Sequence, residues 1–422
     1  MAVSLEELVK VLEIWLKLIK KPQEQQYVDP NLDPVLLVPG IAGSILEAVD
    51  QNGHSDRVWV RIFAADYMFR TKLWSRFDPS TGKTLSLDPN TTIRVPEDRD
   101  GLYAIDVLDP DLVFEKYVKN WIAIAAPFQG APGYVTSTML NGCSFVEGWE
   151  QNFFISKWSM HQLLIECPSV YELMACPDFH WRNPPYLELW REKHDDDGNS
   201  HIRLESYTLE ESITIFEKSL SSNTVDYVGG SMPLPFNLDI LNWANETREI
   251  LSRARVPPKV KFYNIYGTSL QTPHSVCYGS EDSPVTDLEE LRYYQAKFTS
   301  VEGDGTVPTE SAKADGLNAE ARVGVPGEHR GILSDHHVFR ILKHWLNAGE
   351  PDPFYDPLND YVILPTEFEI ERVMEKCLHV TTLQEEWEII PKDADVIDDS
   401  VDAKEHPISF ISVSEVASLS VQ

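Results

Sequence analysis

Two loop motifs in the last third of the chain carry an acid and a histidine between glycines. Asp304 lies in Gly-Asp-Gly-Thr-Val-Pro, and His329 follows in Gly-Glu-His-Arg-Gly. A carboxylate that holds a histidine lets the imidazole take a proton from a hydroxyl, which is the acid–base half of nucleophilic acyl transfer. Taken alone, Asp304 could equally form an Asx turn and His329 could be a surface residue. Their order and short separation favour a catalytic acid and base.

A glycine-rich turn near the N-terminus offers a place for the oxyanion of such a reaction. The four apolar residues 35–38 predict a strand covered on both faces, and Pro-Gly-Ile-Ala-Gly follows them. The backbone N–H of Ile41 would point into the site. A phosphate-binding turn is the alternative, but no Lys or Gly-Lys-Ser follows. We expect Ile41 to supply an oxyanion donor.

No serine stands in the setting that a nucleophile requires. Gly-x-Ser-x-Gly and its His-Ser-Met-Gly variant are missing from the 422 residues. Ser231 and Cys277 lack a strand before them and a helix after them, which a nucleophile elbow needs. Ser44 lies on the oxyanion turn and would point away from it. The sequence therefore predicts a catalytic acid and base without their nucleophile.

The composition excludes some partners and cofactors. A formal net charge of −31 argues against nucleic acid as a partner, because phosphate binding needs a basic stripe. Neither a P-loop nor the alternating acids of a calcium loop occurs. We therefore expect no cofactor and no metal.

The cysteines and the first residues favour an intracellular protein. The five cysteines are an odd number without a Cys-x-x-Cys pair, which suits a reducing compartment. The first residues lack the basic n-region of a signal peptide, and no run of eighteen apolar residues predicts a spanning helix. We expect a cytoplasmic protein, with peripheral contact to internal membranes left open.

The clearest helix is predicted over residues 4–21. Ser4 and Glu7 form a capping-box pattern, and leucines recur at helical spacing up to Pro22. One interpretation is a helix that lies on the body of the domain. The other is a membrane-surface anchor, because Trp15 sits among leucines and lysines cluster at one end.

The remaining pattern predicts an α/β domain over residues 27–380. A helix and linker at 1–26 precede this domain, and an acidic tail at 381–422, predicted to be disordered, follows it. An aromatic-rich, proline-broken region at 131–260 predicts a cap over an apolar pocket, although its aromatic residues could simply form its own core. The other predicted strands are 58–63, 92–95, 121–126, 259–266 and 322–325, and the other predicted helices are 111–119 and 335–346.

Four of these motifs, read in order, resemble the lecithin–cholesterol acyltransferase family, in particular its plant intracellular, phospholipase A-like branch. They are Val-Pro-Gly-Ile-Ala-Gly-Ser at 38–44, Ala-Ala-Pro-Phe-Gln-Gly-Ala-Pro at 125–132, the Asp304 motif and the His329 motif. The resemblance implies an α/β-hydrolase fold with a lid, and a serine triad that moves an acyl chain from a glycerophospholipid to water or an alcohol. It makes Asp304 the triad acid, His329 the base and Ile41 an oxyanion donor.

One departure from the family is large. The resemblance implies that the serine elbow and several central strands belong between Leu112 and Val113, which are adjacent here. We expect an internal deletion, an incomplete central sheet and exposed flanking strands at 35–38 and 121–126. Catalysis by this chain is then not expected. The alternative is a non-catalytic lipid-binding or interaction protein that keeps the cap and pocket.

Overall fold

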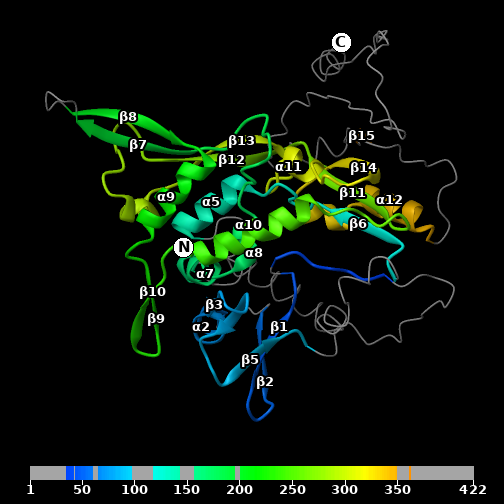
Figure 1. Ribbon diagram of the computed structural model, residues 1–422, viewed down its shortest axis with the longest axis horizontal. Helices are drawn as coiled ribbons and strands as arrows, with labels where there is room; N and C mark the ends of the chain where they lie inside the picture. Colours follow the sequence, from blue (N-terminus) through cyan, green and yellow to red (C-terminus); the bar gives the residue numbers. More distant parts are fainter. Residues whose placement is uncertain are drawn as a thin grey trace, which may run out of the picture.

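The computed structural model describes residues 35–41, 43–59, 65–96, 117–142, 156–194, 200–348 and 361–362. The helix predicted at 4–21, the junction between Leu112 and Val113 and the tail at 381–422 lie outside these residues, as does almost all of the helix predicted at 111–119. The described part mixes helices with parallel and antiparallel strands, so the predicted α/β class is confirmed (Figure 1).

A parallel sheet carries the loop of His329. Its order is β15–β14–β11–β6, with β6 at Asn120–Ile124, β11 at Lys261–Thr268, β14 at Ala319–Pro326 and β15 at Tyr361–Val362. All but the first residue of β11 are buried, as expected for a parallel strand covered on both faces. Because the strands are parallel, the loops that follow them gather at one edge of the sheet.

One side of β6 has no partner among the described strands. β6 pairs with β11, with Ile124 opposite Ile265, and ends the sheet on that side. Residues 35–38 form no strand, and Leu37 is 84% exposed. The prediction of a buried strand at 35–38 is therefore wrong. A strand is buried only where neighbours cover its faces and pair with its backbone, and the described sheet offers residues 35–38 neither.

A second sheet, of order β13–β12–β7–β8, belongs to the cap side of the molecule. Its strands are β7 (Leu187–His194), β8 (Ser200–Tyr207), β12 (Leu270–Tyr278) and β13 (Lys297–Gly303). β7 lies in the aromatic-rich region and pairs in parallel with β12, which lies beyond residue 260. The aromatic-rich region therefore shares its sheet with later residues.

Helices beside this second sheet enclose the largest hydrophobic core, with α5 (Pro132–Asn141) packed on β12. The others are α7 (Lys157–Leu164), α8 (Pro168–Glu172), α9 (Leu209–Ser219), α10 (Leu238–Ser252) and the 3-10 turn η3 (Leu288–Tyr293). Thr208 and Glu211 form a capping box that starts α9. Inside, Phe236 packs against Tyr171 and Phe216 at ring distances of 5.1 and 5.3 Å. Many of the cap's aromatic residues thus form its own core.

Small sheets, most of them from the N-terminal part of the chain, lie on one side of these helices (Figure 1). They are β1 (Leu46–Asp50), β2 (Ser55–Trp59) and β5 (Thr91–Arg94); the hairpin β3 (Ser75–Asp78) and β4 (Lys83–Ser86); and the hairpin β9 (Thr224–Tyr227) and β10 (Gly230–Pro233). The short helix α2 (Ala65–Met68) continues into the π-helical turn η1 (Phe69–Leu73).

The buried carboxylate of Glu166 joins this layer to the cap. It accepts hydrogen bonds from Arg76 Nη1 and from the backbone N–H of Phe77, both at 2.9 Å. Asn237, the N-cap of α10, donates to it at 3.3 Å. One buried acid thus connects β3 with the start of α10.

The C-terminal part of the described chain closes the parallel sheet. It contains α11 (Thr309–Lys313), the 3-10 turn η4 (Gly331–Ser334) and α12 (His336–Leu346). Val338 and Ile341 of α12 pack on Ile265 and Val323 of the sheet. The helix predicted at 335–346 is confirmed, with Asp335 as its N-cap. Within the described ranges, no helix is long and apolar enough to cross a membrane.

Candidate active site

The structure brings Asp304 and His329 into contact. Asp304 directly follows β13, and His329 lies in the loop after β14. The Oδ2 atom of Asp304 lies 2.8 Å from Nδ1 of His329. The carboxylate is buried, whereas the imidazole side chain is 31% exposed. This arrangement suits an acid that stays fixed and a histidine that can meet a substrate.

Backbone groups hold the Asp304 carboxylate from its other side. Its Oδ1 atom accepts hydrogen bonds from the N–H groups of Thr306 and Val307, at 2.9 and 2.7 Å. Its own backbone carbonyl accepts from the N–H of His329 at 2.9 Å. The Asx turn and the acid–histidine pair are therefore not alternatives. One carboxylate oxygen makes the turn, and the other faces the histidine.

Two neighbouring positions fix the turn around Asp304. Gly305 has a φ of +84°, a backbone conformation that favours glycine, and its N–H donates to Thr272 Oγ1 at 2.9 Å. A Cβ at Gly267, near the end of β11, would collide with the Cβ of Asp304. Glycine at 267 thus lets Asp304 pack directly against the parallel sheet.

The second ring nitrogen of His329 is available for chemistry. With the Nδ1–H donating to Asp304, Nε2 carries the lone pair of a neutral imidazole. In the part of the chain that the structure describes, Nε2 has no hydrogen-bond partner. A hydroxyl placed against Nε2 would lose its proton to a base whose cation Asp304 stabilises.

The serine and cysteine candidates lie elsewhere. Ser231 is an exposed residue of β10, opposite Asp226 of the β9–β10 hairpin, so a strand does precede it, although no elbow follows. Cys277 lies within β12 opposite Lys297, and burial raises the pKa of its thiol. Ser44 lies in the loop before β1. No hydrogen bond joins any of the three to His329 among the described residues.

One serine near the site is not evident from the sequence. Ser269 follows β11, is buried, and has a φ of +71°, a strained conformation for a residue other than glycine. Its Oγ lies 3.2 Å from Thr268 Oγ1 and makes no hydrogen bond to His329. The only signal in the sequence is the Gly-Thr-Ser that ends a buried strand.

Ile41, the predicted oxyanion donor, forms no hydrogen bond with Asp304 or His329 among the described residues. Ile41 lies on an exposed segment before β1, where the N–H of Gly43 donates to the carbonyl of Gly40 at 3.0 Å. Its role as an oxyanion donor stays a prediction.

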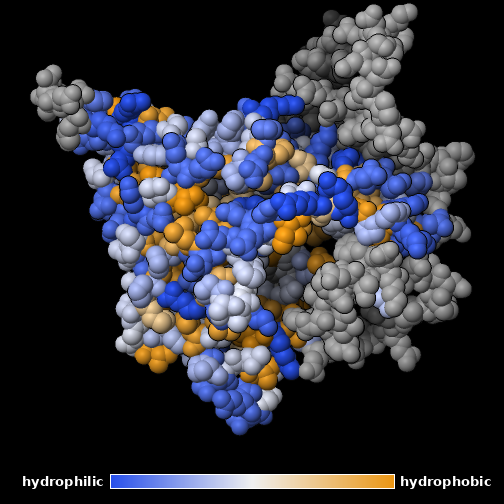
Figure 2. All heavy atoms as spheres, in the orientation of Figure 1, coloured by the Kyte–Doolittle hydropathy of each residue, from blue (hydrophilic) through white to orange (hydrophobic). Residues whose placement is uncertain are grey.

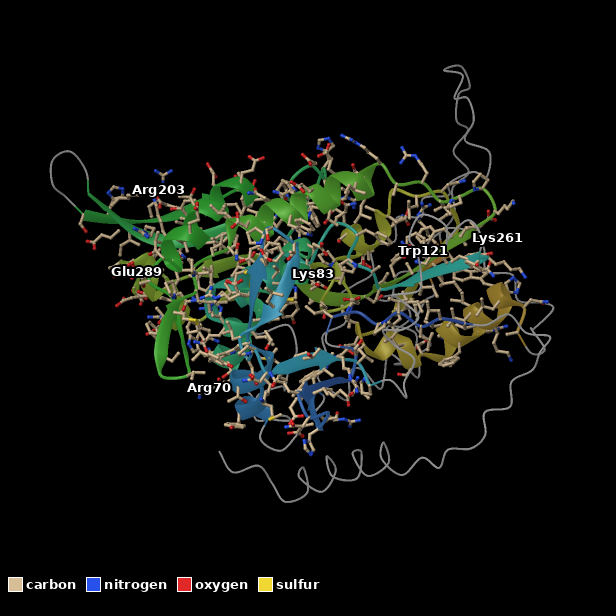
Figure 3. All side chains as sticks on the ribbon, turned by 60° about the horizontal axis from the view of Figure 1, so that its bottom comes forward. Arg70, Lys83, Trp121, Arg203, Lys261 and Glu289 are labelled. Carbon is tan, nitrogen blue, oxygen red and sulfur yellow. The ribbon has the colours of Figure 1, made fainter. Side chains whose placement is uncertain are left out.

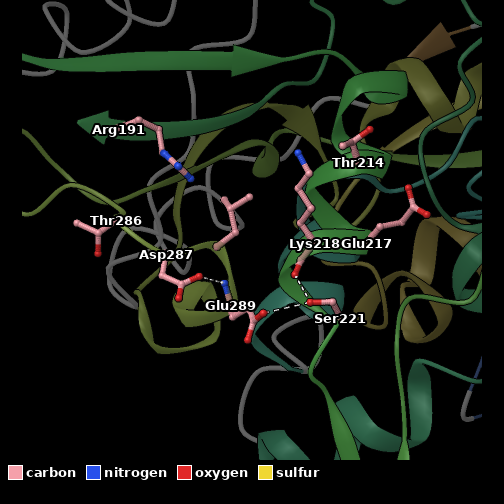
Figure 4. A pocket seen from close by; sticks show the side chains of 9 residues that line it. Arg191, Thr214, Glu217, Lys218, Ser221, Thr286, Asp287 and Glu289 are labelled. Atoms are coloured by element: carbon pink, nitrogen blue, oxygen red, sulfur yellow. Dashed lines mark hydrogen bonds between the residues drawn. The ribbon is translucent and has the colours of Figure 1, made fainter. Parts of the chain in front are cut away.

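An open pocket of about 770 Å³ lies on the cap, away from Asp304 and His329. Arg191 of β7, Lys218 of α9 and Glu289 of η3 line it (Figure 4). Glu289 accepts hydrogen bonds from the hydroxyls of Ser221 and Ser222, at 3.2 and 2.5 Å. Among the described residues, no cluster of three or more His, Cys, Asp or Glu side chains could hold a metal ion.

A mixed α/β fold in which a buried acid meets a histidine, and in which that histidine lies on a loop after a strand of a parallel sheet, defines an α/β-hydrolase-like protein. The family model of lecithin:cholesterol acyltransferase matches residues 102–319, about half of the chain. The chain therefore belongs to the lecithin:cholesterol acyltransferase family, whose members include lipid acyltransferases and phospholipases.

Two relatives from Arabidopsis thaliana extend this match. Lecithin-cholesterol acyltransferase-like 4 is 55% identical over 94% of this chain and 90% of its own length. Phospholipase A(1) LCAT3 is 42% identical over 75% of this chain and 91% of its own length.

Both alignments contain more positions than the number of residues of this chain that they cover. The first extends over 484 positions but uses 94% of 422 residues, which is about 397. The second extends over 405 positions but uses 75%, which is about 316. In each alignment, between 80 and 90 positions of the relative therefore have no counterpart in this chain.

Proposed function

We propose that this chain keeps the acid–base half of a phospholipid acyl-transfer site and lacks its nucleophile, so that it does not catalyse as it stands. The observation that carries the proposal is the hydrogen bonding of the two ring nitrogens of His329. Its Nδ1 is held by the buried Asp304 at 2.8 Å, while its Nε2 has no partner among the described residues. A hydroxyl could therefore donate a hydrogen bond to Nε2, but none of the described serines does so.

In a complete site, a serine hydroxyl at Nε2 would attack the ester carbonyl of a glycerophospholipid. His329 would take the serine proton, and Asp304 would stabilise the resulting imidazolium. The backbone N–H of Ile41 would donate to the oxyanion of the tetrahedral intermediate. The lysophospholipid would leave with the proton from His329, and the acyl-serine would pass its acyl chain to water or to an acceptor alcohol.

Three observations support the loss of a block between Leu112 and Val113. β6, which begins at Asn120, pairs on one side only among the described strands. The apolar residues 35–38 are exposed rather than part of a sheet. Both relatives carry more than 80 aligned positions that this chain does not have. A single missing block that contains the serine elbow accounts for all three.

A non-catalytic lipid-binding or interaction protein is the second candidate. The completeness of the cap core favours it, since the aromatic cluster around Phe236 is intact. The coding sequence at the junction of Leu112 and Val113 distinguishes the two candidate functions. An in-frame coding segment for a His-Ser-Met-Gly elbow between the codons of Leu112 and Val113 supports an enzyme represented by a shortened product. An uninterrupted junction supports the second candidate.

A chimera tests the proposal directly. The block of lecithin-cholesterol acyltransferase-like 4 that has no counterpart here is inserted between Leu112 and Val113, and release of fatty acid from phosphatidylcholine is measured. We expect activity in the chimera, loss of that activity in its His329→Ala variant, and none in the original chain. An active chimera that keeps its activity after His329→Ala would contradict the role given to His329.

A further inference from the structure

One exposed segment of this acidic chain is locally basic. Residues 249–261 contain Arg253, Arg255, Lys259 and Lys261, all exposed, against one acid, Glu249. The chain as a whole has a net charge of −31. Arg253 is partly neutralised because it forms an ion pair with Glu249. The other three cations give this segment a positive charge, whereas the net charge of the chain is negative.

Two large apolar side chains stand beside these cations. Ile250 is 71% exposed and Leu251 is 63% exposed, both in the last turn of α10. On the face drawn in Figure 2, hydrophobic and strongly hydrophilic spheres adjoin where α10 ends. In the chain, these two exposed aliphatic residues are followed by the exposed cations, and we call this amphipathic set of residues the α10 patch: Ile250, Leu251, Arg255, Lys259 and Lys261.

The fold holds the α10 patch in place. Arg248 donates from Nη2 to the backbone carbonyls of Tyr171 and Met174, at 2.6 and 3.0 Å. These bonds tie the last turns of α10 to the end of α8, while Ile240 and Ala244 are buried on the inner face of the helix. Ile250 and Leu251 are therefore kept outward and cannot turn into the core without breaking the Arg248 contacts.

We infer that the α10 patch docks on an anionic lipid surface. Ile250 and Leu251 would enter the boundary between headgroups and acyl chains, and the cations would face lipid phosphates and carboxylates. Each Lys or Arg near such a surface contributes about a fivefold gain in partitioning. At physiological salt, charges more than about 8 Å away are largely screened, so the local sign outweighs the net charge of the chain.

The position of the α10 patch separates docking from chemistry. Lys261 begins β11, and Gly267, which touches Asp304, lies near its other end. The strand rises by roughly 3.3 Å per residue, which places the two ends of this stretch about 20 Å apart. Docking at the α10 patch therefore does not depend on catalysis at His329, and the inference does not rest on the proposed function.

Lys119 extends the basic surface. Its carbonyl accepts a hydrogen bond from the N–H of Lys261 at 2.9 Å, and its side chain is exposed. In Figure 3, Lys261 lies near Trp121 at one end of the molecule, and Arg203 lies at the opposite end. Arg203 and its exposed neighbour Ile202 on β8 therefore offer a matched control, a cation and an aliphatic residue outside the α10 patch.

The test is co-sedimentation of the full chain with vesicles of phosphatidylcholine alone or mixed with phosphatidylserine. We expect binding to the mixed vesicles only, weakened by added salt. The triple variant Arg255→Gln, Lys259→Gln, Lys261→Gln should lower the partition coefficient about 100-fold. The pair Ile250→Ser and Leu251→Ser should lower it as well. The control pair Ile202→Ser and Arg203→Gln should bind like the unchanged chain.

Three outcomes would overturn the inference. The first is no binding to the mixed vesicles. The second is unchanged binding by the triple variant. The third is an equal loss in the control pair. A Leu12→Glu variant separates this surface from the helix predicted at 4–21. If Leu12→Glu abolishes binding while both variants of the α10 patch bind normally, the helix and not the α10 patch is the docking element.

Discussion

The side chain of Asp304 packs directly against the backbone of Gly267, because glycine has no Cβ. The Cβ of Asp304 fills the position that a side chain at 267 would take. This contact seats the acid against the sheet while its Oδ2 reaches His329 at 2.8 Å. The acid–histidine pair thus depends on a glycine of β11 as much as on its own loop.

Gly267→Ala should destabilise the protein by about 1–3 kcal/mol, because the added methyl group forces Asp304 or β11 to move. Denaturant unfolding measures the free energy directly. The matched control is Gly327→Ala, whose added Cβ would meet no atom within 4 Å, in the loop that carries His329. Equal losses in the two variants would mean that packing against Asp304 is not the cause.

Asp304→Ala should cost far more stability than His329→Ala. Removal of the carboxylate leaves the N–H groups of Thr306 and Val307 without their acceptor, which costs about 3 kcal/mol. His329 is partly exposed, and its loss should cost less than about 1 kcal/mol. Urea unfolding of both variants compares them, and a similar cost for each would contradict the anchoring role of Asp304.

The ion pair of Arg322 with Asp315 should be strongly coupled. Arg322 donates to both carboxylate oxygens, each at 2.9 Å, and the Asp315 side chain is fully buried. Arg322→Leu alone should cost about 3–5 kcal/mol, because it leaves a buried acid without its cation.

The double variant Arg322→Leu with Asp315→Leu removes both charges and should therefore lose less stability than Arg322→Leu alone. Unfolding of the double variant and of each single variant completes the cycle. Simple additivity of the two single costs would show that the pair does not act as a unit.

His161 should make stability depend on pH. Burial lowers the pKa of His161 to about 4, against 6.5 for an unburied histidine. The unfolded chain then takes up a proton at a higher pH than the folded chain does, so stability is present above pH 6.5 and is lost as the pH falls towards 4.

Between pH 7 and pH 5, this group should cost about 2 kcal/mol of unfolding free energy. The variant His161→Gln removes the titrating group but keeps a donor for the carbonyl of Thr138, which His161 Nδ1 faces at 3.2 Å. Chemical unfolding at the two pH values should show a smaller difference in this variant. An unchanged difference would assign the pH dependence to other groups.

The local pattern of the sequence predicted the strands and loops that position the pair. The alternating pattern at 259–266 predicted a strand, seen as β11, and the motifs around Asp304 and His329 placed both residues in loops. Their contact joins the two sheets, because Asp304 follows β13 of the second sheet and His329 follows β14 of the parallel sheet.

Other features depend on contacts that no local pattern records. Residues 35–38 read as a strand, but strand formation requires a neighbour that the described sheet does not provide. The pairing of β7 with β12 joins segments far apart in the chain. The positive φ of Ser269 and the hydrogen bond from Gly305 to Thr272 likewise arise only from the folded arrangement.

The absence of a working nucleophile is tested most directly by labelling the purified chain with a fluorophosphonate probe, which reacts with activated serines. The chimera with the block inserted between Leu112 and Val113 serves as the positive control. We expect a labelled chimera and no labelling of the original chain at any serine. Labelling of the original chain that disappears in its His329→Ala variant would show a working nucleophile and would contradict the central claim.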